Sequence, residues 1–369
     1  MHISSVEIHR FTMKLKSPFV ISLGRLEAGY NVVVKIHASN GFTGTGECSP
    51  FMTINGESVE TAMAIGKHLS AALTGMDPLD IEACTASMDR LVYGNSSIKS
   101  AFDMALYDIM SQHAGLPLYA FLGGSNDRVL QTDYTVSLGE PEHMAADAAA
   151  IREAGFQYIK VKLGGDPGTD ISRVLAVRRA IGPAIPLRLD ANQGWDVPGA
   201  IRVLNALGEA NIQYCEEPIP RWNYTKLPEV RANSPVAIMA DESCCDHHDA
   251  ERLIDMGACD MINIKLGKSS GIFKALKIIE LAEQADIPLM IGGFLESRIG
   301  FTASAHLALA SKQVMFIDFD SPLMFTDDPV EGGITYHDHG LVKVPDTPGL
   351  GVTVETASIV NNKQELPTP

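Results

Sequence analysis

The stretch YIKVKLGG, residues 158–165, is an apolar run that carries two lysines and ends in two glycines. We predict a buried strand here. Side chains of a strand alternate, so Lys160 and Lys162 point to the same face. Lysine is rarely buried without a partner. A related run, MINIKLGK at residues 261–268, carries Lys265.

Eight short apolar runs of this kind follow one another, separated by amphipathic stretches with helical periodicity. The charged residues near their ends, from Lys162 to Asp318, lie 22 to 31 residues apart. This is about the length of a strand–helix unit that returns to a parallel neighbour. We therefore predict a (β/α)₈-type barrel with its functional residues at the C-terminal ends of the strands. An open doubly wound sheet would show a similar alternation, but functional groups at nearly every strand end favour the barrel. The runs are QTDYTVS (131–137), YIKVKLGG (158–165), IPLRLDAN (185–192), IQYCEEP (212–218), VAIMADES (236–243), MINIKLGK (261–268), IPLMIGGFLES (287–297) and VMFIDFDSP (314–322).

The residues before the barrel have the pattern of an α+β domain. Residues 6–13 and 31–39 alternate as strands do, and helical periodicity covers residues 59–73 and 96–113. We expect the chain to leave the barrel after its last strand and to return to this first domain. The predicted division is a capping domain at 1–125, the barrel at 126–325 and the C-terminal segment at 326–369.

Composition excludes several classes of protein. The chain has 369 residues, 46% of them hydrophobic, which is enough for a large core. Its 29 basic and 45 acidic residues give a formal charge of −16, which argues against binding to nucleic acid or to an anionic membrane. No stretch has the length of a membrane span, and the polar N-terminus is unlike a signal peptide. The six cysteines form no CxxC pair. We expect a cytoplasmic protein with reduced thiols that forms homo-oligomers.

Three carboxylates lie at the ends of adjacent predicted strands. Asp190, Glu216 and Asp241 end strands three, four and five, without histidine or cysteine among them. Such a set suits a hard dication, and we predict one Mg²⁺ per subunit. The alternative is that they are three unrelated salt-bridge acids.

Two lysines face each other across the predicted barrel mouth, because their strands are four apart among eight. Lys162 could remove the α-proton of a carboxylate substrate while Lys265 returns one to the other face, through an enediolate that the metal stabilises. This inverts the α-carbon. A lysine base must be neutral, and the charges of Lys160 and of the metal lower its pKa. Alternatively, Lys160 and Lys162 bury only their aliphatic stems and extend their charged ends to solvent where the strand ends.

The last strand carries a pair of acids opposite the predicted metal site. Asp318 and Asp320 share one face of FIDFD and are suited to bind a cation. The implied substrate has a carboxylate, an acidic α-hydrogen beside it and an ammonium several bonds away. A dipeptide fits this description.

Taken together, these motifs resemble the muconate lactonizing enzyme subgroup of the enolase superfamily, over nearly the whole chain. The resemblance implies an α+β cap on a modified TIM barrel of (β/α)₇β type, completed by the C-terminal segment. The motifs are KVK (160–162), LDANQGW (189–195), EEP (216–218), ADES (240–243), IKLGKSSG (264–271), GGFLES (292–297) and the link IKSAFDMALYDI (98–109) followed by GLPLYAFLGG (115–124).

Within this superfamily DFDSP, residues 318–322, resembles the Asp-x-Asp element of dipeptide epimerases, including the L-Ala-D/L-Glu epimerases. The resemblance implies an isomerase with Lys162 and Lys265 as its acid/base pair, and Thr135 and Lys160 as substrate contacts. Glu242 would orient Lys265. N-acylamino acid racemisation and o-succinylbenzoate synthesis are alternatives on the same scaffold, but neither substrate has an ammonium. We also include Asn192 as a supporting residue and Glu296 as a substrate contact.

The substrate side chains are expected to contact loops of the cap. Phe19, Met52 and Ile54 would make an apolar environment. A glutamate side chain would need a basic partner, for which Arg25 and Arg298 are the candidates. We therefore keep a small or apolar dipeptide such as Ala-Ala beside Ala-Glu. A non-catalytic binding protein is disfavoured by the intact lysines and acids, and a metallohydrolase by the lack of histidine at the strand ends.

Overall fold

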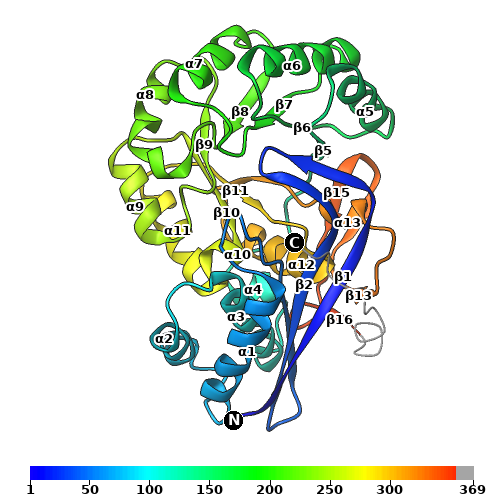
Figure 1. The fold of residues 1–369 in the computed structure, drawn as a ribbon. Coiled ribbons are helices and arrows are strands. Elements are labelled where there is room, and N and C mark those ends of the chain that lie inside the picture. Colours follow the sequence, from blue (N-terminus) through cyan, green and yellow to red (C-terminus); the bar gives the residue numbers. More distant parts are fainter. Residues whose placement is uncertain (355–369) are drawn as a thin grey trace.

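A sheet of eight parallel strands forms the larger part of the protein, whose structure is a computed structural model that describes residues 1–354 (Figure 1). Each strand pairs with the next one along the chain, as the strand spacing predicted. A parallel bridge between Thr132 and Ile317 brings the two edges of the sheet together. The strands are β5 (Tyr134–Val136), β6 (Ile159–Lys162), β7 (Leu187–Asp190), β8 (Ile212–Glu216), β9 (Ile238–Ala240), β10 (Met261–Lys265), β11 (Leu289–Gly292) and β12 (Val314–Ile317).

Helices connect successive strands of this sheet and cover its outside (Figure 1). Several begin at a side chain that accepts a backbone N–H of the first turn, as Asp166, Asp196 and Ser297 do. Only the four-residue helix α13 (Ser321–Met324) comes directly after β12, so the (β/α)₇β order is confirmed. The connecting helices are α5 (Pro141–Glu153), α6 (Pro167–Ile181), α7 (Val197–Ala206), α8 (Leu227–Ala232), α9 (His247–Asp255), α11 (Ile272–Gln284) and α12 (Arg298–Ala310).

The N-terminal cap consists of an antiparallel sheet and helices. The strands β1 (Ile3–Ile21) and β2 (Gly24–Ala38) form a long hairpin whose tip reaches the barrel (Figure 1). There the Ser22 hydroxyl donates a hydrogen bond of 2.8 Å to the carbonyl oxygen of Asn192, directly after β7. The hairpin tip therefore lies over the C-terminal ends of the barrel strands. The other elements of the cap are β3 (Thr43–Cys48), α1 (Val59–Leu73), α2 (Ile81–Leu91) and α3 (Ser96–Ala114).

Buried carboxylates of the cap bind the N-termini of two barrel helices. Glu47 accepts hydrogen bonds from the backbone N–H of Ser297 and Gly300, at 3.0 and 2.9 Å. Asp103 accepts one from Ile272 at 2.5 Å. Negative groups are favoured at helix N-termini, so these contacts fix the cap on the barrel.

The C-terminal segment contacts both parts of the protein. Its strand β15 (Leu341–Lys343) pairs with β4 (Leu130–Gln131), and β13 (Val330–Gly332) pairs with β16 (Val352–Val354). Asp108 of α3 accepts the backbone N–H of Leu350 at 2.8 Å. The rest of the predicted segment, residues 355–369, lies outside the described residues.

Two glycines allow α3 to lie directly on β3. A β-carbon at Gly44 would overlap the carbonyl oxygen of Ala105, and one at Gly46 would overlap that of Ala101. The backbones of helix and strand therefore approach more closely than any other residue type permits.

Gly46→Ala is expected to lower the free energy of unfolding by about 3 kcal/mol, because overpacking at a rigid backbone forces the helix away from the strand. Chemical denaturation followed by circular dichroism measures this change. Gly139→Ala is the matched control, since a β-carbon there meets only Met144 Cγ, at 3.8 Å. Equal stability of both variants would contradict the close contact.

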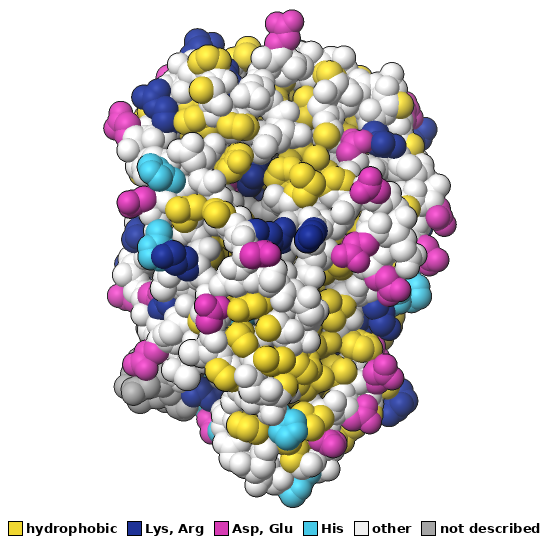
Figure 2. Space-filling view, turned by 180° about the vertical axis from the view of Figure 1, so that it is seen from behind, with side chains coloured by type: hydrophobic (Ala, Val, Ile, Leu, Met, Phe, Trp, Pro, Cys, Tyr) yellow, Lys and Arg dark blue, Asp and Glu magenta, His cyan; other side chains and the backbone are white. Residues whose placement is uncertain are grey.

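Charged side chains of both signs are mixed on the face drawn in Figure 2, where Lys and Arg lie scattered among Asp and Glu. This face has no continuous basic surface of the kind that binds nucleic acid. None of the helices within residues 1–354 combines the length and the apolar character needed to cross a bilayer.

Candidate active site

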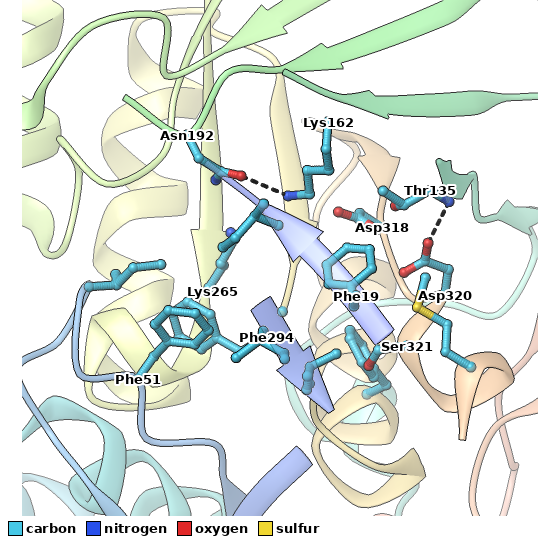
Figure 3. A pocket seen from close by; sticks show the side chains of 17 residues that line it. Phe19, Phe51, Thr135, Lys162, Asn192, Lys265, Phe294, Asp318, Asp320 and Ser321 are labelled. Atoms are coloured by element: carbon cyan, nitrogen blue, oxygen red, sulfur yellow. Dashed lines mark hydrogen bonds between the residues drawn. The ribbon is translucent and has the colours of Figure 1, made fainter. Parts of the chain in front are cut away.

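A cavity of about 60 Å³ lies where the hairpin tip covers the C-terminal ends of the barrel strands (Figure 3). Barrel and cap both contribute to its wall. The structure thus brings together residues that are far apart in the sequence. The predicted site residues that line it are Phe19, Ile54, Thr135, Lys162, Asn192, Lys265, Asp318 and Asp320.

The two predicted acid/base lysines reach this cavity from strands four positions apart in the sheet, β6 and β10. The Nζ of Lys162 donates hydrogen bonds to Asp190 at 2.6 Å and to Asn192 at 3.2 Å. The Nζ of Lys265 donates to Asp241 at 2.7 Å. Each ammonium is thus tied to one of the predicted metal ligands.

An aromatic ring lies near each of these ammonium groups. The Nζ of Lys162 is 5.9 Å from the centre of the Phe19 ring, and that of Lys265 is 5.2 Å from the centre of the Phe294 ring. Figure 3 shows Phe19 and Phe294 lining the same cavity as the lysines. Both lysines are buried, with Lys162 8% and Lys265 4% exposed.

The carboxylates of Asp190, Glu216 and Asp241 are fully buried at the ends of β7, β8 and β9. Lys160 lies between the first two, with its Nζ 3.3 Å from Asp190 and 2.6 Å from Glu216. Lys265 lies between the last two, 3.9 Å from Glu216. Positive charge therefore sits between each neighbouring pair of these acids.

Burial and the charge of Asp190 raise the pKa of Glu216 to about 7. Burial alone would lower the pKa of Lys160, but the charges of Asp318 and Glu216 outweigh it and raise that pKa. Lys162 and Lys265 act against burial at the other two acids and lower the pKa of Asp190 and of Asp241. An all-carboxylate set at adjacent strand ends fits a hard dication such as Mg²⁺.

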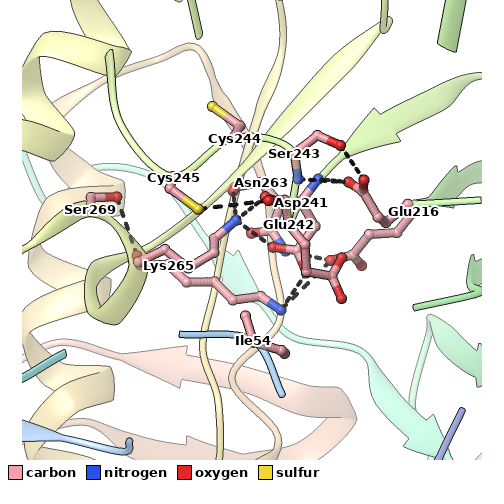
Figure 4. A network of polar contacts seen from close by, with 12 residues as sticks. Ile54, Glu216, Asp241, Glu242, Ser243, Cys244, Cys245, Asn263, Lys265 and Ser269 are labelled. Carbon is pink, nitrogen blue, oxygen red and sulfur yellow. Dashed lines mark hydrogen bonds and ion pairs between the residues drawn. The ribbon is translucent and has the colours of Figure 1, made fainter. Parts of the chain in front are cut away.

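Two residues that the sequence analysis missed, Asn263 and Lys268, contact these acids; Figure 4 labels Asn263 together with Glu216 and Asp241. Asn263 donates a hydrogen bond of 2.6 Å to Glu216, and the Nζ of Lys268 lies 2.5 Å from an oxygen of Asp241. Both residues could have been predicted from the sequence pattern. Asn263 precedes Lys265 by two residues on the same strand and so shares its face, and Lys268 belongs to the same motif.

A second acidic cluster lies on the side of β12. The carboxylates of Asp133, Asp318 and Asp320 each have an oxygen within 4.8 Å of the other two, close enough to hold a cation. Asp320 also accepts the backbone N–H of Thr135 at 2.7 Å (Figure 3). Burial and the charge of Asp318 raise the pKa of Asp320 to about 7. Asp133 was not predicted, although it belongs to the same run as Thr135, QTDYTVS.

Several predicted residues are not among those that line the cavity, among them Arg25, Arg298 and Glu296. Arg25 is exposed and pairs with Glu27 at 2.7 Å. Arg298 extends to the C-terminal segment, where it pairs with Asp328 and donates to the carbonyl oxygen of Ile334 at 3.2 Å. Glu296 lies near Glu47, and burial together with that charge raises its pKa to about 8.

Some predicted contacts take a different form. Glu242 accepts a hydrogen bond of 3.2 Å from Asn192, whereas we expected it to orient Lys265. Its other oxygen has no hydrogen-bond partner in the described chain. Lys160 is 1% exposed, does not line the cavity and contacts Glu216 and Asp318, whereas we expected a direct substrate contact. Met52 is exposed and does not line the cavity.

Most of the remaining wall is apolar, and the sequence analysis did not name these side chains. The wall side chains after β11 and β12 follow a strand end, and this position in the sequence could have predicted them. The wall side chains from the cap have no such sequence signal, since their approach to the barrel depends on how the cap packs on it. The additional wall side chains are Ile21, Leu26, Phe51, Phe294, Leu295, Phe301, Ser321 and Met324.

An α+β cap over a (β/α)₇β barrel, with acids on adjacent strand ends and lysines facing each other, defines an enzyme of the enolase type. Two family models match in agreement with this: residues 3–123 match the mandelate racemase/muconate lactonizing enzyme N-terminal domain, and residues 143–358 match the enolase C-terminal domain-like model. The chain belongs to this family of the enolase superfamily, and it is an isomerase.

The chain is similar to several epimerases over almost its full length. It is 56% identical to a D-Ala-D/L-Ala epimerase of Cytophaga hutchinsonii, covering 95% of each chain. It is 38% identical to a hydrophobic dipeptide epimerase of Enterococcus faecalis, covering 96% of this chain and 100% of that one. A crystal structure of dipeptide epimerase from Cytophaga hutchinsonii, complexed with Mg and the dipeptide D-Ala-L-Val, matches with a TM-score of 0.97 and 55% identity, covering 98% of each chain.

Proposed function

We propose that this protein is a Mg²⁺-dependent dipeptide epimerase that inverts the α-carbon of the C-terminal residue. The observation that carries the proposal is the pair Lys162 and Lys265, which enter one cavity from β6 and β10 with buried carboxylates between them. The similarity to dipeptide epimerases over nearly the whole chain supports it.

Each group has one task in this proposal. Asp190, Glu216 and Asp241 would hold Mg²⁺, which supplies positive charge that binds a substrate carboxylate and stabilises the negative charge developing when the α-proton leaves. Lys162 takes the proton from one face of the α-carbon, and Lys265 gives a proton to the other face. Their aromatic neighbours keep water from competing for these protons.

The second acidic cluster, beside β12, would bind the other end of the substrate. Asp318 and Asp320 both line the cavity, and a free N-terminal ammonium would pair with them. An N-acylated amino acid has no such charge. The cluster therefore favours a dipeptide over the substrates of an N-acylamino acid racemase or an o-succinylbenzoate synthase.

We propose a substrate of the Ala-Xaa type with a small or apolar second residue, such as Ala-Ala. The wall is apolar, and among the described residues that line the cavity the basic ones are Lys162 and Lys265. A glutamate side chain would thus be buried without a basic partner, which is unfavourable. Ala-Glu is the weaker alternative.

Incubation of the protein with Mg²⁺ and a dipeptide library in D₂O is expected to place deuterium at the α-carbon of the C-terminal residue. Mass spectrometry and proton NMR locate the label. Ala-Ala should react faster than Ala-Glu by about tenfold or more, because a buried unpaired charge costs over 1.4 kcal/mol. Exchange confined to N-acylamino acids would contradict the proposal, and preference for Ala-Glu would contradict only the substrate choice.

We also propose a cytoplasmic location, with the dipeptide as a small-molecule substrate and neither nucleic acid nor membrane as a partner. The six cysteines are free thiols, five of them buried, which supports a reducing compartment. Fractionation of the native cells, followed by detection of the protein, tests this location.

A further inference from the structure

A third carboxylate lies beside Asp318 and Asp320 and has no task in the proposed reaction. Asp133 precedes β5 and is fully buried. Its Oδ2 accepts a hydrogen bond of 2.8 Å from Arg188, whereas its Oδ1 has no hydrogen-bond partner in the described part of the chain. The cluster therefore contains a buried oxygen that lacks positive charge beside it.

Arg188 is held beneath this cluster by the barrel interior. It lies on β7 and is 2% exposed. Its Nε donates to Gln213 at 2.9 Å and its Nη1 to the carbonyl oxygen of Ile317 at 3.2 Å. The ring of Tyr158 lies 4.4 Å from the guanidinium carbon. Among the three acids of the cluster, its ion pair is with Asp133.

Lys160 supplies the other nearby positive charge, and it is shared. Its Nζ lies 2.7 Å from Asp318, but it also contacts Glu216 at 2.6 Å. Burial and the charge of Asp318 raise the pKa of Asp133, so ionisation of all three carboxylates together is unfavourable without a further positive charge. When all three are ionised they face two basic groups at most, and a buried unpaired charge is costly. A single ammonium would balance the negative charge of the cluster, whereas a dication would add more positive charge than the cluster needs.

We propose that Asp133 is a positioning residue for ammonium recognition: together with Arg188, it sets the charge of the cluster so that the site requires one positive charge from the ligand. This inference rests on the proposed function. It gives Asp133 an electrostatic role without contact with the reacting atoms. It also explains how the site would reject a ligand of the same shape that has no ammonium.

Two non-reacting ligands test the inference. Alanyl-α-aminoisobutyrate has an ammonium but no α-hydrogen on its C-terminal residue, so it binds without turnover. N-propionyl-α-aminoisobutyrate has nearly the same shape and no ammonium. Isothermal titration calorimetry with saturating Mg²⁺ gives the Kd of each ligand for the wild type, for Asp133→Asn and for Asp255→Asn, an exposed charge control on α9.

Asp133→Asn should weaken binding of the ammonium ligand by about tenfold or more, since it leaves Arg188 unpaired and repelling. Binding of the propionyl ligand and of Mg²⁺ should stay within about twofold of the wild type, because neither uses this charge. Asp255→Asn should match the wild type. The double variant Asp133→Asn/Arg188→Gln restores the charge count and should recover most of the lost affinity, which a purely structural defect would not do.

Unchanged binding by Asp133→Asn, or an equal loss for both ligands, would overturn the role of Asp133. Should Asp133→Asn fail to fold, the double variant decides alone: it must prefer the ammonium ligand as the wild type does. A wild type that binds both ligands equally would instead overturn ammonium recognition itself, and with it the proposed function.

Discussion

Lys162→Ala is expected to lower the rate of dipeptide epimerisation by about 100- to 10,000-fold, the usual contribution of a positioned acid or base. It should nevertheless leave one half of the reaction. Lys265 still faces the α-hydrogen of one epimer and can exchange it with solvent. Proton NMR in D₂O, started separately from each epimer, should show loss of the α-proton signal from one epimer only. Lys265→Ala should show it from the other.

Lys67→Ala, at an exposed position on α1, serves as the control and should keep full activity. Exchange from both epimers in Lys162→Ala would mean that one base serves both faces of the α-carbon. The two-lysine scheme would then be wrong, although the protein could still be an epimerase. Exchange from neither epimer would mean that Lys265 is not a base.

Asp241→Asn is expected to weaken Mg²⁺ binding by at least about 100-fold, since replacement of residues that merely support metal ligands already costs 10- to 100-fold. Calorimetric titration with Mg²⁺ measures this without any turnover. The epimerase activity of this variant should fall together with its Mg²⁺ affinity. Removal of the metal from the wild type by a chelator should abolish activity until Mg²⁺ is added back.

Asp318→Asn provides the matched comparison, because it removes the same charge from the other acidic cluster. We expect it to bind Mg²⁺ normally and to lose affinity for the dipeptide. The reverse result, with Mg²⁺ lost in Asp318→Asn and kept in Asp241→Asn, would assign the metal to Asp133, Asp318 and Asp320 instead.

The barrel and its lysines and acids follow from the sequence because the residues that matter are attached to strand ends. A strand fixes both the direction and the spacing of its side chains, so counting residues from Lys162 to Lys265 also counts positions around the barrel. The strand order and the (β/α)₇β fold were confirmed. Thr135, Lys162 and Lys265 lie in one cavity for the same reason.

The cap and the long side chains were harder to predict. Arg298 stands one residue after a strand-end motif, yet its flexible side chain turns to carbonyl oxygens of the C-terminal segment. Ile21 and Leu26 reach the cavity because Glu47 and Asp103 dock the cap on two barrel helices. Neither local periodicity nor charge spacing predicts how the cap docks on the barrel. The side chains that form the cavity wall could therefore not be predicted from the sequence.

The hairpin of the cap limits how this enzyme can change its substrate during evolution. Phe19 pairs with Leu26 across the hairpin, and Ile21 pairs with Gly24 around a turn of only two residues. Because strand side chains alternate, inserting one residue here would turn a whole row of wall side chains away from the cavity. Single replacements at Phe19 or Leu26 would only reshape it. New substrate preferences should therefore arise by substitution at a hairpin of constant length.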